Sequence, residues 1–138
     1  MRALWRDVEA EYHGSHYSVE SSWSWPKPMQ ADGPSVHLGS RASLENFAAI
    51  ARWGHGWLPI EGYGSVIEHL PRLKDAFAAA DRAEPPVVSV YSSSGVQALM
   101  EQYRRAGVDR VVLALPPGDE RMVLQALDAA TVHLSALR

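Results

Sequence analysis

The residues best suited to binding chemistry are Gly39, Ser40 and Arg41, which follow a short apolar run and precede a helix-length segment. A glycine at such a turn lets the backbone approach a ligand closely. The N-terminus of the following helix offers unpaired N–H groups and the positive end of its dipole, and both suit a phosphate. Ser40 adds a hydroxyl, and Arg41 adds a fork of donors. The turn could therefore bind an anion, or it could be an ordinary turn before a helix, with a serine as its N-cap.

Trp57, which follows Gly56 in the next apolar run, is the second candidate ligand-binding residue. In a barrel of parallel strands, the carboxyl ends of the strands face the active site, so this ring could line a ligand pocket. The alternative is that Trp57 packs inside the barrel or between strand and helix. The chain has no nucleophile elbow, Walker loop or GxGxxG motif, and no catalytic residue is identified. Redox chemistry would therefore have to come from a bound cofactor.

The remaining polar candidates are weaker. His13 and His16 lie near acidic residues, but their spacing fits no strong metal-ligand pattern, so no metal site is predicted. His55 is expected at the surface or at a helix end, and His69 is isolated. The serines at 92–94 could contact a ligand, or Ser94 could serve as the N-cap of the next helix.

Four short apolar runs alternate with helix-length segments along most of the chain. The expected strands are 35–38, 56–60, 87–91 and 110–115, and the expected helices are 1–11, 42–53, 63–82, 95–105 and 119–137. Pro71 predicts a kink or a restart within its helix, and Gly107 predicts a helix end. Strands that alternate with helices indicate βαβ units and a parallel sheet, that is, an α/β fold.

Residues 13–35 interrupt this pattern as a Pro/Trp-rich loop insertion or a small hairpin. Pro26 and Pro28 lack an N–H, so the segment cannot be a central strand. Trp23 and Trp25 form an aromatic cluster within it. The cluster is either a lid or partner contact, or an anchor that holds the loop against the rest of the fold.

Four segments occur in an order that resembles the C-terminal half of luciferase-like monooxygenases and their deazaflavin-dependent relatives. They are WPKPMQ at 25–30, PSVHLGS at 34–40, AAIARWGHGWLP at 48–59 and YRRAGVDRVVLALPP at 103–117. Each is weak alone, and their order and spacing make the resemblance, which extends from about residue 1 to about residue 130. Two positions depart from the family pattern: Ser40 replaces the second of two glycines, and His55 replaces an aspartate.

The resemblance implies a single domain over residues 1–138, which is the C-terminal half of a TIM (β/α)8 barrel with about four parallel strands and flanking helices. It implies a flavin- or F420-dependent oxidoreductase, with coenzyme F420 or FMN as cofactor and an unknown small organic substrate. Gly39, Ser40 and Arg41 would bind the phosphate tail of the cofactor, and Trp57 would form part of the pocket wall. The upstream half would be missing, so independent catalysis is not expected.

Composition limits the other functions. The chain has 138 residues, whereas a complete barrel needs roughly 200 or more. Its formal net charge of −3 favours neither nucleic acid nor an anionic membrane as a partner. It has no cysteine, which excludes disulfides and fits a cytoplasmic location. No apolar run approaches the roughly 20 residues of a membrane span.

A half-barrel would expose two sheet edges and an apolar face, and these favour association. The chain could pair with a second copy of itself or with an N-terminal-half protein to close a barrel. It could instead fold back as a small open sheet, covered by helices and by residues 13–35, or be the product of a misplaced start codon. The alternative function is a non-catalytic cofactor-binding or accessory subunit that associates through these edges.

Overall fold

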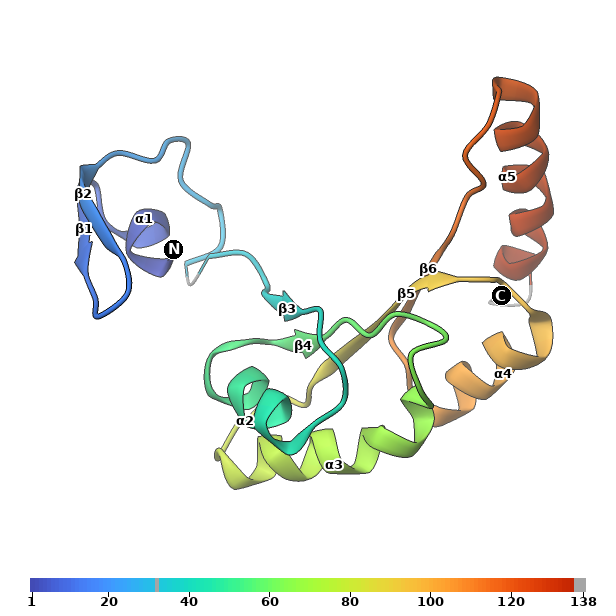
Figure 1. Cartoon of the computed structure of the whole chain (residues 1–138), viewed down its shortest axis with the longest axis horizontal. Coiled ribbons are helices and arrows are strands. Elements are labelled where there is room, and N and C mark those ends of the chain that lie inside the picture. The colour runs from blue at the N-terminus through green and yellow to red at the C-terminus, as the bar shows by residue number, and fades with distance from the viewer. Residues whose placement is uncertain (32, 136–138) are drawn as a thin grey trace. The chain divides into compact units, whose positions relative to one another are not determined.

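The computed structural model describes residues 1–31 and 33–135, and the chain divides into two compact units, Met1–Ser35 and Val36–Arg138. Figure 1 shows the elements of each unit, which we describe separately. The sequence predicted a single domain over residues 1–138 with an insertion at 13–35. Both remain predictions, because a division into compact units does not test them.

The first unit contains a short helix and an antiparallel hairpin. Its elements are α1 (Arg2–Arg6), β1 (Ala10–His13) and β2 (Ser18–Ser22). The helix expected over residues 1–11 is therefore wrong beyond Arg6. Asp7 already has an extended backbone, and Tyr12 pairs with Val19 across the hairpin. Aromatic and β-branched side chains favour such a pleated pairing over a helix.

Lys27 holds the Pro/Trp-rich segment to α1. Its Nζ donates to the carbonyl oxygens of Leu4 and Asp7 at 2.9 and 2.5 Å and lies 5.0 Å from the centre of the Trp25 ring. A cation at this position satisfies carbonyl groups that the end of the helix leaves open. Trp25 is 63% exposed and Trp23 is 76% exposed, so the choice between a lid or partner contact and an anchor stays open for both rings.

The second unit is a parallel sheet flanked by helices. Its strands, hydrogen-bonded in this order, are β3 (His37–Leu38), β4 (Gly56–Trp57), β5 (Val87–Ser93) and β6 (Arg110–Leu113). Its helices are α2 (Leu44–Trp53), α3 (Val66–Ala79), α4 (Gln97–Ala106) and α5 (Glu120–Ser135). The α/β class with four parallel strands and flanking helices is confirmed. The loops that follow the strands all leave from the same carboxyl edge of the sheet, where open α/β sheets bind ligands.

One face of the sheet packs against the helices and forms the core. The strand register places Leu38, Trp57 and Val88 side by side in one row. Trp57 and Val88 belong to the same buried cluster as Phe47 of α2 and Leu73 of α3, and Leu38 packs against it. Since successive side chains on a strand point to opposite faces, the next residues along each strand point away from this core.

Several element boundaries differ from the sequence predictions for local reasons. The helix expected from residue 63 begins at Val66, because Gly62 and Gly64 have φ angles of +91° and +104° that a helix cannot accept. Ser65 then caps it, with its Oγ accepting from the Glu68 N–H at 3.4 Å. Pro71 lies inside this helix, which continues to Ala79, so the expected restart does not occur.

The last two helices follow the prediction more closely. α4 begins two residues later than expected and ends at Gly107, whose φ of +83° confirms the predicted helix end. The final helix, expected over 119–137, is Glu120–Ser135, and residue 137 lies outside the described residues. Within the described part of the chain, no helix is both long and apolar enough to cross a membrane.

Candidate functional site

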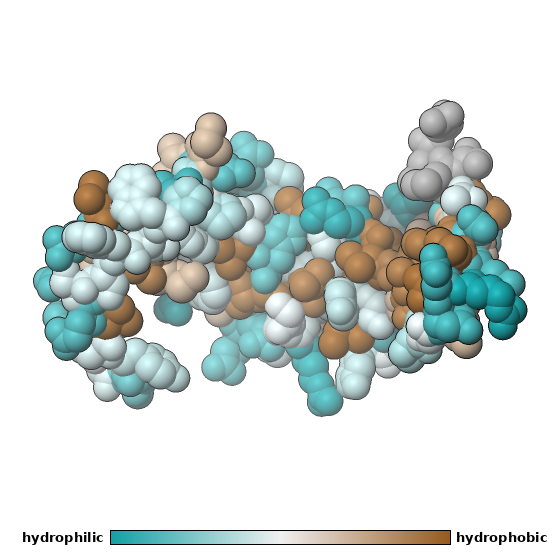
Figure 2. Space-filling view, turned by 90° about the horizontal axis from the view of Figure 1, so that it is seen from above, coloured by the Kyte–Doolittle hydropathy of each residue, from teal (hydrophilic) through white to brown (hydrophobic). Residues whose placement is uncertain are grey.

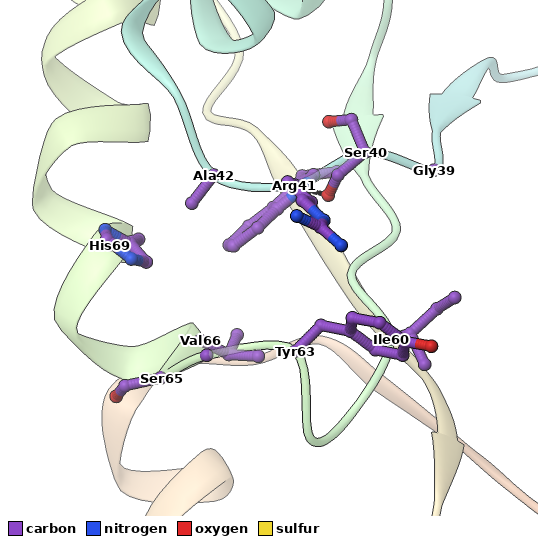
Figure 3. A pocket seen from close by; sticks show the side chains of 11 residues that line it. Gly39, Ser40, Arg41, Ala42, Ile60, Tyr63, Ser65, Val66 and His69 are labelled. Atoms are coloured by element: carbon purple, nitrogen blue, oxygen red, sulfur yellow. Dashed lines mark hydrogen bonds between the residues drawn. The ribbon is translucent and has the colours of Figure 1, made fainter.

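A cavity of about 370 Å³ lies at the carboxyl edge of the sheet, between the turn after β3 and the loop after β4. All four site residues predicted from the sequence line it. They are joined by residues from the β4–α3 loop and the first turns of α3 (Figure 3). The lining residues are Gly39, Ser40, Arg41, Ala42, Trp57, Ile60, Tyr63, Gly64, Ser65, Val66 and His69. Parallel pairing of β3 and β4 brings these two loops together.

The turn after β3 is held by backbone contacts. The Ser40 carbonyl accepts a hydrogen bond of 2.9 Å from the Trp57 indole N–H, and the Arg41 carbonyl accepts one of 2.9 Å from the Asn46 side chain. A Cβ added at Gly39 would meet only the Leu58 carbonyl, at 3.7 Å. The open space at Gly39 leaves the backbone of the turn accessible from the cavity side.

Ser40 does not cap the helix that follows it. Ser43 is the N-cap of α2, and its Oγ accepts from the Asn46 N–H at 3.0 Å. The Ser40 Oγ is buried and has no hydrogen-bond partner among the described residues. A buried hydroxyl without a partner is costly. The alternative of an ordinary turn with a serine N-cap therefore stays open, with Ser43 and not Ser40 as the capping residue.

Arg41 is the cation at the mouth of the cavity. Its guanidinium carbon lies 5.8 Å from the centre of the Tyr63 ring, which belongs to the opposite loop. Figure 3 shows both side chains at the same opening. An aromatic face attracts a guanidinium and restricts its side-chain freedom. The Tyr63 ring thus keeps the donors of Arg41 near the cavity.

Trp57 combines the two roles that the sequence left open. It is only 2% exposed and packs edge-to-face against Phe47, with ring centres 5.1 Å apart and an angle of 79° between the rings. It also forms part of the cavity wall and donates its indole N–H to the turn that contains Ser40. Trp57 therefore belongs to the core and positions the turn, with a small part of its surface available to a ligand.

The sequence prediction missed Tyr63 and His69. His69, expected to be isolated, lies one turn into α3 and lines the cavity with Ser65 and Val66. Residues separated by three or four positions share one face of a helix. The spacing of Ser65 and His69 could have indicated that both side chains face the same cavity, but only if the start of the helix had been known.

Glu61 is the second feature that the sequence did not reveal. Its carboxylate accepts from the Ser93 Oγ at 2.6 Å, from the Ser94 N–H at 2.8 Å, from the Ser94 Oγ at 2.6 Å and from the Tyr103 hydroxyl at 3.3 Å. The expectation that Ser94 caps α4 is thus wrong, because its hydroxyl is bound to Glu61 and Val96 occupies the N-cap position. The four contacts tie the loop after β4 to the end of β5 and to α4.

The electrostatics of this cluster favour an ionised carboxylate. Burial alone would raise the pKa of Glu61, but the hydrogen bonds from Ser93, Ser94 and Tyr103 outweigh it, and the pKa is lowered. Burial, followed by the nearby charge of Glu61, raises the pKa of Tyr103 to about 12. Tyr103 therefore stays a neutral hydrogen-bond donor, and Glu61 uses its oxygens within the protein.

A bulge in β5 creates this cluster. The register with β6 shifts between Val90 and Ser93, and Ser92 has a φ of +58°. The unusual backbone at Ser92 directs the buried Ser93 hydroxyl toward Glu61. Bulges commonly redirect side chains in this way near functional sites.

The histidines at other positions have structural contacts. The His55 Nδ1 accepts from the Val36 N–H at 2.9 Å and so joins the start of β4 to the start of β3. His13 lies 2.8 Å from the Ser18 hydroxyl in the hairpin. Among residues 1–31 and 33–135, no three His, Cys, Asp or Glu side chains are grouped so that they could hold a metal ion.

Comparisons with known proteins find relatives in sequence and a solved structure of similar fold. No family model matches the chain. The uncharacterized proteins Mb0978c of Mycobacterium bovis and Rv0953c of Mycobacterium tuberculosis are 34% identical to it over 116 residues, which cover 84% of this chain. The chain spans 41% of the length of these relatives.

A solved structure is similar to this chain in fold and is also longer than this chain. The monooxygenase RslO1 from Streptomyces bottropensis aligns with 94% of this chain at a TM-score of 0.55 and 18% identity, over 38% of its own length. The likeness at this identity concerns the fold alone. The chain therefore has the fold of a part of a larger α/β protein.

Proposed function

We propose that this chain is a domain of a luciferase-like oxidoreductase, in which the cavity at the turn after β3 holds the phosphate tail of FMN or coenzyme F420. The observation that carries the proposal is the meeting of Gly39, Ser40, Arg41 and Trp57 at one cavity on the carboxyl edge of a parallel sheet. The fold that the chain shares with a protein described as a monooxygenase is further support.

The residues present fit a phosphorylated tail. Arg41 can direct two N–H groups to phosphate oxygens, and the buried Ser40 hydroxyl has no hydrogen-bond partner within residues 1–31 and 33–135. Trp57 fixes the backbone of the turn, and Ile60 and Val66 provide apolar wall. The cofactor, when bound, would supply the redox chemistry, while this chain binds and orients it. A catalytic residue is not assigned.

The same proposal describes the sheet as the C-terminal half of a (β/α)8 barrel. In such a barrel, the sheet face away from the helices lines the interior. His37 and Ser89 lie on this face, with the His37 Nδ1 3.5 Å from the Ser89 Oγ. Burial, followed by the charge of Arg110, lowers the pKa of His37. A small organic substrate would approach from this face, in a protein that we expect in the cytoplasm.

A second candidate function is a non-catalytic accessory subunit. Among the described residues, β3 pairs only with β4 and β6 only with β5, so each has an open outer edge. Apolar side chains of α5 are also exposed, including Leu124 at 50% and Val132 at 63%. Figure 2 shows hydrophobic residues gathered on the side of the second unit where α5 lies. Such surfaces favour pairing with a second copy or with an N-terminal-half protein.

One set of measurements separates the two candidates. Oxidised and reduced FMN and F420 are titrated against the purified protein, and its oligomeric state is measured by light scattering with and without cofactor. Binding with turnover, alone or after addition of an N-terminal-half partner, supports the oxidoreductase. Association without any cofactor binding supports the accessory subunit.

Arg41→Ala is expected to weaken binding of the phosphorylated cofactor about 10- to 100-fold, because a charge-assisted hydrogen bond contributes about 1.5–3 kcal/mol. Arg41→Lys should recover only part of this loss, since lysine keeps the charge but not the fork of donors. Cofactor fluorescence measures the affinity. Arg52→Ala, on the exposed side of α2, is the matched control. Equal affinities for Arg41→Ala and wild type would refute the proposed tail site.

A further inference from the structure

The cavity has side chains with N–H donors on two different walls. Arg41 comes from the turn after β3, and His69 comes from α3. Figure 3 shows His69 on α3 at one side of the cavity and Arg41 at the other side, with Ala42 and Val66 between the two sides. None of the described lining residues is acidic. An anion that enters between the two loops would therefore meet the Arg41 guanidinium on one side and the His69 imidazole on the other.

The helix that borders this cavity is α3 and not α2. The lining residues of the first wall stop at Ala42, before Ser43 caps α2. On the second wall, Gly64, Ser65 and Val66 all contribute to the lining. α3 has 14 residues, so the partial positive charge of its first turn adds to the charge of Arg41.

We infer that His69 is a second anion-binding residue, and that a phosphate ester binds between Arg41 and His69 instead of resting on the start of α2. This inference rests on the proposed function, since it concerns the same cavity. The imidazole ring offers an N–H donor in either protonation state, and a phosphate offers several acceptor oxygens to donors from two directions. FMN and F420 both carry such a phosphate, so the shared chemistry is the phosphate ester itself.

The inference makes His69 selective for the phosphorylated part of a ligand. His69→Gln is expected to weaken binding of FMN or F420 about tenfold, while the affinity for riboflavin or dephosphorylated deazaflavin stays unchanged. The FMN and F420 arms identify which phosphate ester the cavity accepts. His16→Gln, at an exposed position of the hairpin turn, is the matched control. An equal loss for ligands with and without phosphate, or no loss at all, would overturn the inference.

A double-mutant cycle adds a readout that a structural role for His69 would not produce. If Arg41 and His69 contact the same phosphate, Arg41→Ala and His69→Gln should lower its affinity non-additively, whereas riboflavin binding should show no coupling. Additive losses would show that the two side chains act on different groups and would contradict a shared site.

Inorganic phosphate separates this inference from the proposed function. Phosphate is titrated against the labelled wild-type chain, and the NMR signals of the His69 ring and the Arg41 side chain are followed. Shifts of both signals, in a protein that binds neither FMN nor F420, would support the anion site and refute the oxidoreductase proposal. Cofactor binding without any phosphate-dependent shift at His69 would refute the anion site alone.

Discussion

Trp57→Ala is expected to lower the free energy of unfolding by about 3–5 kcal/mol, the usual range for removing a large aromatic side chain from a core. Trp57 is 2% exposed and in edge-to-face contact with Phe47, so its removal leaves a cavity between β4 and α2. It also releases the Ser40 carbonyl from its hydrogen bond. Urea denaturation followed by circular dichroism measures the loss.

Trp57→Phe separates packing from positioning. Phenylalanine keeps an aromatic ring beside Phe47 but has no N–H for the Ser40 carbonyl, so the expected loss of stability is about 1 kcal/mol. The turn would still lose its anchor, and the affinity for a phosphorylated ligand should fall while the fold persists. Trp53→Ala is the comparison, because Trp53 is 40% exposed and should cost much less than Trp57→Ala. A loss for Trp57→Ala as small as the one expected at the exposed Trp53 would show that the core does not depend on Trp57.

Most of the fold of the second unit could be predicted from short apolar runs and from the residues that end helices. The strands at 87–91 and 110–115 are apolar and β-branched, and both occur, with β5 extending to Ser93 and β6 ending at Leu113. Gly107 was identifiable as a helix end because its position after a helical stretch requires a left-handed conformation. The parallel arrangement followed from alternation of strands and helices.

The turn at Gly39–Arg41 could be found in the same way, since a strand, a glycine and a helix are adjacent in the sequence. The sequence suggested that the helix directly after the turn, α2, would border the site, whereas the structure places α3 there. α3 follows the next strand, β4, and comes close to the turn only because β3 and β4 pair in parallel. The sequence indicated the turn that lines one side of the cavity but not the residues of the opposite wall. His69 was missed for this reason.

Contacts between residues distant in the sequence also explain two further errors, one at the start of the chain and one in β5. The first residues fit a helical spacing about as well as an alternating one, and pairing with residues 18–22 decides between them. In β5, the extra residue at Ser92 cannot be read from a run of three serines. Without that bulge, Ser94 is a reasonable N-cap, and Glu61 has no identifiable partner.

Glu61→Ala is expected to cost about 2–4 kcal/mol of unfolding free energy. Its carboxylate accepts hydrogen bonds from Ser93, Ser94 and Tyr103, and both Ser93 and Tyr103 are buried. Each buried donor left without a partner costs about 1–3 kcal/mol. The loop that contains Ile60 and Tyr63 would also lose its connection to β5, so the affinity for a phosphorylated ligand should fall together with stability. Denaturant unfolding and cofactor titration measure the two effects.

Glu61→Gln removes the charge of the side chain and keeps its size. Glu84→Ala, at an exposed loop position, is the control, and its free energy of unfolding is expected within about 0.5 kcal/mol of wild type. The pKa of Glu61 is lowered in the folded state, so its contribution is fully present above the unfolded value of about 4.3 and is lost as the pH falls through the lower folded value. Wild type should therefore lose its advantage over Glu61→Gln as the pH falls below about 4.3. Glu101, whose pKa is lowered to about 2 by Arg104 and Arg105, titrates in both proteins and cancels in the difference. A difference between the two proteins that does not change with pH would mean that Glu61 acts through its shape and not through its charge.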